Sequence, residues 1–125
     1  MALTLWIALG GALGATLRHF MNIWIARIAG GDFPWHTMVI NISGSFGMGL
    51  LISVMALRWN VGNDLRAFLT TGILGGYTTF SAFSLDFAVL VERKAYTLAG
   101  AYALGSVVVS LLAIFVGMAL ARALA

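Results

Sequence analysis

The chain has 125 residues, of which 62% are hydrophobic and only 9% charged, and its mean hydropathy is +1.02. A soluble domain of this size could not hide so much apolar surface, and a disordered chain has the opposite composition. The net charge of +3 comes from scattered basic residues, which excludes a nucleic-acid-binding patch, and the lack of cysteine excludes disulfides and thiolate metal sites. We therefore expect an all-α integral membrane protein in a lipid bilayer.

Four apolar stretches are long enough to cross a bilayer, which requires roughly 20 residues each. The connections between them are short and polar or glycine-rich, so they leave no room for an extramembrane domain. The sequence predicts a single transmembrane domain over residues 1–125, with helices at 3–28, 34–57, 65–91 and 96–124.

The basic residues do not favour one orientation in the membrane. With four spans, both termini and the second loop share one side, and the other two loops share the opposite side. Three basic residues lie on each side: Arg58, Arg66 and Arg122 against Arg27, Arg93 and Lys94. Because an excess of Lys and Arg normally sets the orientation, this balance predicts insertion in both orientations and an antiparallel homodimer.

The third span contains three glycines and several hydroxyl groups between residues 70 and 81. Glycine destabilises a helix by about 1 kcal/mol relative to alanine, and irregular backbone in a membrane survives only inside protein or along a cavity. We therefore expect a break near residues 75–79. Carbonyl groups before such a break suit Na⁺, whereas N–H groups after it favour an anion. A glycine face for close helix packing is the alternative.

After the expected break, Phe80, Phe83, Ser84 and Phe87 share one face of a helix. Phenylalanines at this spacing usually face a core or lipid. Their ring edges are also weakly positive, so they can hold a small anion loosely, as conduction requires. Ser81 and Ser84 would add hydrogen-bond donors.

Polar groups occur in two other spans. Asn41 in the second span needs a hydrogen-bond partner. The amide either bonds to a neighbouring helix and stabilises helix packing, or it donates to an anion. Tyr102, Ser106 and Ser110 form a polar stripe on the fourth span, although close packing explains the serines equally well.

Arg18 and Asp86 are charged residues inside the first and third spans, where ionisable groups are functional candidates. Arg18 either reaches the headgroup region or draws anions into a vestibule, and Asp86 either pairs with it or reaches water. His19 and His36 have no further ligand at metal-binding spacing, so we expect no transition-metal site. The sequence offers no nucleophile with a base and no phosphate loop, which argues against an enzyme.

Three motifs together resemble the CrcB/Fluc family of fluoride channels over nearly the whole chain. The motifs are GGALGATLR at 10–18, FPWHTMVINISGSF at 33–46 and GILGGYTTFSAFS at 72–84. His19, His36 and Ala82 stand where the family usually has Tyr or Trp, Gly and Thr. The third motif is the most distinctive of the three.

The resemblance implies an antiparallel, dual-topology homodimer in the bacterial inner membrane that lets F⁻ leave the cell passively through two pores. It also implies a structural Na⁺ held by the backbone carbonyls of Gly75 and Thr78 from both subunits. The implied pore residues are Phe80, Phe83, Asn41, Ser110 and Tyr102, with Arg18 near the vestibule. Ile114 replaces a threonine of some relatives, so Ser81 and Ser84 are expected to carry more of the hydrogen bonding.

Two other functions fit the same composition. A small multidrug-type, proton-coupled cation exporter shares the length and the four spans, but it needs an acidic residue deep in the bundle, and Asp86 is the only substitute. The other is a non-transporting membrane subunit whose glycines and serines only pack helices.

Overall fold

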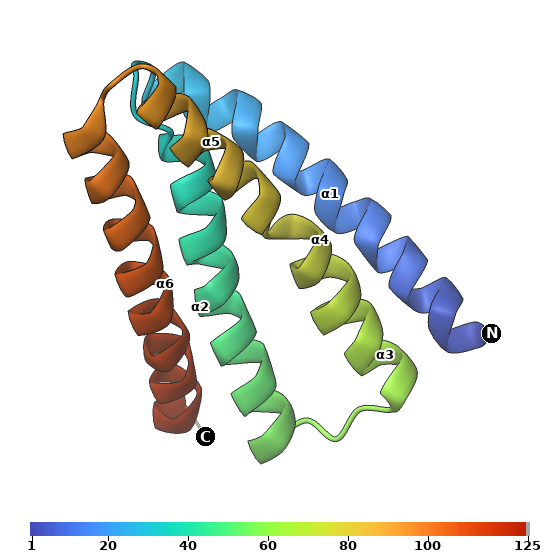
Figure 1. The fold of residues 1–125 in the computed structure, drawn as a ribbon. Helices are drawn as coiled ribbons and strands as arrows, with labels where there is room; N and C mark the ends of the chain where they lie inside the picture. The colour runs from blue at the N-terminus through green and yellow to red at the C-terminus, as the bar shows by residue number, and fades with distance from the viewer. Residues whose placement is uncertain (125) are drawn as a thin grey trace.

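The computed structural model describes residues 1–124, and all of the regular structure in that range is helical (Figure 1). Three helices are continuous, and the third apolar segment is divided into four pieces. The continuous helices are α1 (Ala2–Ile28), α2 (Trp35–Leu57) and α6 (Tyr96–Leu124). The divided segment consists of α3 (Asn63–Ala67), the π-helical turns η1 (Phe68–Leu74), α4 (Gly75–Tyr77) and α5 (Phe80–Glu92).

Three segments of the described chain are long and apolar enough to cross a membrane: α2, the divided segment Asn63–Glu92 and α6. Helix α1 has 27 residues and is long enough by geometry, but it contains Arg18 and His19 and is not among these three. Its membrane crossing therefore stays a prediction.

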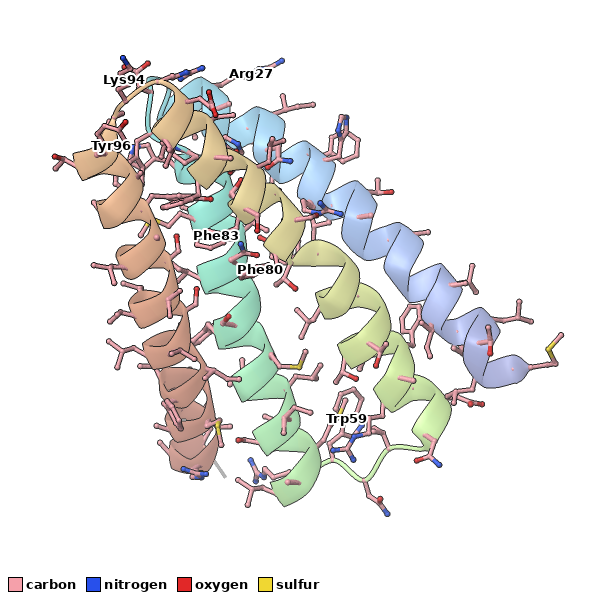
Figure 2. The ribbon with its side chains drawn as sticks, in the orientation of Figure 1. Arg27, Trp59, Phe80, Phe83, Lys94 and Tyr96 are labelled. Carbon is pink, nitrogen blue, oxygen red and sulfur yellow. The ribbon has the colours of Figure 1, made fainter. Side chains whose placement is uncertain are left out.

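The helices run between two ends of the molecule (Figure 1). The start of α1, the end of α6 and the connection between α2 and α3 lie at one end, and the other two connections lie at the opposite end. Figure 2 shows Arg27 and Lys94 at one of these ends and Trp59 at the other. This alternation is what an up-and-down path through a bilayer requires.

Glycines bring the helix backbones into direct contact. A Cβ atom built on Gly117 of α6 would lie 2.8 Å from the backbone nitrogen of Leu50 in α2. A Cβ atom on Gly72 would lie 2.8 Å from the Cα atom of Gly10 in α1. Glycines of the third segment therefore pack closely on α1, and the segment is interrupted as well, so the break and the close-packing glycine face are both present.

Few side chains are fully buried. Tyr102, Ile40 and Leu90 are the largest of them, while most large apolar residues of α1 and α6 are exposed. Exposed apolar surface on long helices is what a membrane protein presents to lipid.

Candidate functional site

The helix interruption consists of Thr78 and Thr79, both in extended conformation between α4 and α5. Thr78 has φ −81° and ψ 156°, and Thr79 has φ −152° and ψ 122°. The Thr78 N–H and hydroxyl both donate to Leu74 O, at 3.1 and 3.0 Å. The Thr79 hydroxyl caps α5 by accepting from the Ala82 N–H at 3.1 Å. The chain thus leaves one half-helix and starts the next within two residues.

Side chains from α1 and α2 hold the interruption in place. Asn41 makes two hydrogen bonds with the backbone of Thr79: its Nδ2 donates to Thr79 O at 3.0 Å, and its Oδ1 accepts from the Thr79 N–H at 2.8 Å. Arg18 donates from Nε to Gly76 O at 3.2 Å. Asn41 therefore joins α2 to the interruption by hydrogen bonds, and Arg18 lies against the last turn of the first half-helix.

A groove of about 510 Å³ lies beside the interruption, between α2, the divided segment and α6. The residues that the family resemblance assigns to the pore or the Na⁺ site and that line it are Asn41, Gly75, Thr78, Phe80, Phe83 and Ser110. Ser106 and Ile114 line it too, and none of its lining residues is charged. Hydroxyl and amide groups thus meet aromatic rings in one uncharged groove.

The two phenylalanines form a pair on α5, as Figure 2 shows. The ring centroids of Phe80 and Phe83 are 5.4 Å apart with planes at 48°. Phe80 is 76% exposed, whereas Phe83 packs against Tyr102 with ring centroids 5.1 Å apart. One ring therefore lies within the helix bundle, and the other lies on an open face of this chain.

Ser106 is the groove residue that the sequence interpretation left without a role. Its side chain is only 5% exposed, and its hydroxyl has no hydrogen-bond partner among the described residues. The sequence already placed Ser106 in a polar stripe with Tyr102 and Ser110, of which it is the middle residue.

Ser81 and Ser84 lie outside the groove, on the exposed face of α5. The Ser84 hydroxyl donates to Phe80 O at 3.0 Å, and the Ser81 hydroxyl lies 3.3 Å from that of Thr79. In one chain these serines are therefore separated from the groove that Phe83 and Ser110 line.

Tyr102 is fully buried between α5, α6 and the start of α2 rather than in the groove. Its hydroxyl donates to Asp86 Oδ2 at 3.1 Å, and its ring packs edge-on against Phe33. Asp86 lines a second cavity of about 410 Å³, together with His36 and Arg93. The partner of Asp86 is thus a tyrosine, whereas Arg18 bonds to Gly76.

The two carbonyls expected to hold Na⁺ have lost their helical partners. In a continuous helix, the N–H of residue i+4 bonds to the carbonyl of residue i. The Thr79 N–H, which would bond to Gly75 O, goes to Asn41, and the Ala82 N–H, which would bond to Thr78 O, goes to the Thr79 hydroxyl. Neutral backbone oxygens of this kind fit a hard monovalent cation.

Comparison with known proteins agrees with these features. A family model described as "CrcB-like protein, Camphor Resistance (CrcB)" matches residues 5–118. A protein of Agrobacterium fabrum (strain C58 / ATCC 33970) named fluoride-specific ion channel FluC is 50% identical over 116 residues, which cover 93% of each chain. A protein of the same name from Chelativorans sp. (strain BNC1) is 52% identical over 118 residues and 94% of each chain. Another, from Rhizobium leguminosarum bv. trifolii (strain WSM2304), is 44% identical over 125 residues and 100% of each chain. This chain therefore belongs to the CrcB family and is a multi-pass membrane protein.

Proposed function

We propose that the protein is a fluoride-selective ion channel, through which F⁻ leaves the cytoplasm by passive electrodiffusion. The observation that carries this proposal is the uncharged groove in which Asn41, Ser110, Phe80 and Phe83 meet. F⁻ is small and strongly hydrated, so a pore must replace its water with donors such as an amide, a hydroxyl and ring edges. The absence of a charged lining residue suits conduction, because a full positive charge would hold the anion too tightly. The relatives named as fluoride-specific channels support the same function.

We propose further that two copies assemble antiparallel in the bacterial inner membrane, with α1 as the fourth span of each. The support is the open face of α5, where Phe80 is 76% exposed and the hydroxyls of Ser81 and Ser84 are also exposed. Hydroxyl groups at this depth favour protein or water over lipid as neighbours. A second copy over this face would complete two pores, and Ser81 and Ser84 would then line them.

A structural Na⁺ belongs to this proposal, held by the Gly75 and Thr78 carbonyls of both subunits. Its bound charge would offset that of nearby anions and join the two interrupted helices. The support is the release of both carbonyls from the helical ladder. Arg18 is proposed to draw anions toward the pore entrance, and Tyr102 to hold Phe83 along the pore.

The cation exporter is the weaker function for this geometry. A proton-coupled exporter needs a deep carboxylate that alternately binds a proton and a cation. Asp86 lies at the middle of α5 and accepts a hydrogen bond from Tyr102, so it is engaged in a side-chain pair. None of the residues that line the groove is acidic.

The test is anion efflux from liposomes that contain the purified protein, with F⁻ compared with Cl⁻. We expect rapid F⁻ efflux without Cl⁻ efflux, and loss of the F⁻ efflux in Phe80→Ile. Phe87→Ile is the matched control, because Phe87 is an exposed ring on the same helix that does not line the groove. Folded protein that releases no F⁻ but takes up a lipophilic cation in exchange for protons would replace the channel with the exporter.

A further inference from the structure

At the interruption, two backbone N–H groups bond to side chains, whereas in a continuous helix they would bond to backbone carbonyls. The Thr79 N–H donates to Asn41 Oδ1 at 2.8 Å, and the Ala82 N–H donates to the Thr79 hydroxyl at 3.1 Å. In a continuous helix these two N–H groups would bond to Gly75 O and Thr78 O. Because these two N–H groups bond to side chains instead, the Gly75 and Thr78 carbonyls of the proposed Na⁺ site are left without their helical donors.

Asn41 fixes Thr79 more firmly than a single bond would. Its Nδ2 also donates to Thr79 O at 3.0 Å, so both backbone polar groups of Thr79 are held by one amide. The side chain thus pairs with Thr79 as a neighbouring β-strand would, which matches the extended backbone of that residue, φ −152° and ψ 122°. Without this amide, the Thr79 N–H would be free to return to Gly75 O.

The hydroxyl of Thr79 has the corresponding effect on the second carbonyl. As the N-cap of α5, it satisfies the Ala82 N–H, and the second half-helix begins at the next residue, Phe80. Thr78 O is thereby left outside the helical ladder. Asn41 and Thr79 act on one carbonyl each, from α2 and from the interruption itself.

We infer that Asn41 and Thr79 are positioning residues that keep the Gly75 and Thr78 carbonyls free to bind a monovalent cation. The inference rests on the Na⁺ site of the proposed function and adds the residues that build it. Because Asn41 also lines the groove, one side chain links the cation site to the proposed anion path. Substitution of Asn41 therefore weakens cation binding even where the groove keeps its shape.

The test measures cation binding directly, by thermal unfolding of the full-length protein in detergent. Unfolding midpoints are recorded as NaCl replaces N-methylglucamine chloride at constant ionic strength, since a ligand that binds only the folded state raises the midpoint with its concentration. The variants are Asn41→Ala, Thr79→Val, which removes the hydroxyl at nearly constant volume, and Thr79→Ser, which keeps it. Ser45→Ala is the control, because Ser45 lies one turn after Asn41 and lines the same groove.

We expect the Na⁺ concentration for the half-maximal shift to rise about fivefold or more in Asn41→Ala and Thr79→Val, the effect of one lost hydrogen bond. Thr79→Ser and Ser45→Ala should titrate like the unchanged protein. The inference is overturned if Thr79→Val titrates like Thr79→Ser, and it is overturned together with the Na⁺ site if the unchanged protein shows no Na⁺-specific shift. Fluoride efflux is measured separately in liposomes, so loss of the channel proposal with the Na⁺ titrations as expected would leave this inference standing.

Discussion

Arg18 of α1 donates a hydrogen bond from Nε to the backbone carbonyl of Gly76, 3.2 Å away and 58 residues later in the chain. Gly76 lies in α4, just before the helix stops, where carbonyl groups lose their helical partners and carry partial negative charge. A guanidinium group is suited to this position because it is always charged and donates in a fixed direction. The contact ties α1 to the interruption.

Replacing Arg18 is expected to loosen the interruption. Arg18→Met keeps an unbranched apolar side chain but leaves Gly76 O without this donor, and a hydrogen bond to a charged group is worth about 1.5–3 kcal/mol. We expect a lower unfolding midpoint in detergent and reduced F⁻ efflux. Arg27→Lys, an exposed change in the same helix that keeps the number of basic residues, is the control and should leave both measurements unchanged. Equal behaviour of the two variants would show that the contact with Gly76 contributes nothing.

The bond between Tyr102 and Asp86 predicts a measurable coupling between α6 and α5. Tyr102→Phe keeps the ring contacts with Phe33 and Phe83 but removes the hydroxyl that donates to Asp86 at 3.1 Å. Because the partner is a partly buried carboxyl group, we expect a loss of about 1–3 kcal/mol in the free energy of unfolding. In a double-mutant cycle with Asp86→Ala, the two losses should not add. Additive losses would mean that the two side chains act independently.

Close packing at the glycines predicts a clear difference between two positions in α6. A Cβ atom on Gly117 would lie 2.8 Å from the Leu50 nitrogen, whereas one on Gly100 would meet no atom within 4 Å. Gly117→Ala is therefore expected to destabilise the protein by about 1–3 kcal/mol through overpacking. Gly100→Ala should be neutral or stabilise by up to about 1 kcal/mol, since alanine favours helix. Unfolding midpoints of the two variants in the same detergent decide this, and equal midpoints would contradict the packing of α2 against α6.

The sequence indicates where the third segment is interrupted, but it does not indicate which groups the backbone bonds to at the interruption. Glycines and threonines at residues 75–79 indicate where a helix in lipid would stop, because those residue types favour irregular backbone. The hydrogen-bond partner of the Thr79 N–H depends on where α2 places Asn41, and no local sequence pattern predicts that position. The same holds for Asp86 and Tyr102, which are 16 residues apart and meet only through packing.

Helical spacing also has a limit that Ser81 and Ser84 illustrate. The spacing places Phe80, Phe83 and Ser84 on one face of α5 but does not say how that helix is rotated against its neighbours. In the structure Phe80 and Phe83 line the groove, while Ser84 bonds back to Phe80 O on the exposed side. In the proposed dimer the neighbours of Ser81 and Ser84 come from the second copy, and helical spacing within one chain does not describe them.

The balance of basic residues leads to a last prediction, which tests the proposed antiparallel pair in cells. Adding Lys at Asn60 and Gly62 should orient every copy one way, and adding Lys at Asp32 and Glu92 should orient every copy the other way, because Lys and Arg favour the cytoplasmic side. Gly62 tolerates a side chain by geometry, since a Cβ atom there meets nothing within 4 Å, and Asp32 and Glu92 are exposed.

Each double variant expressed alone should lose F⁻ efflux, because copies of one orientation cannot pair antiparallel. Expression of both variants together should restore it, with efflux measured in cells loaded with fluoride. The control is replacement of the same four residues by Gln, which leaves the numbers of Lys and Arg unchanged. Full efflux from either Lys variant alone would mean that copies in one orientation form the channel, and the antiparallel dimer would have to be abandoned.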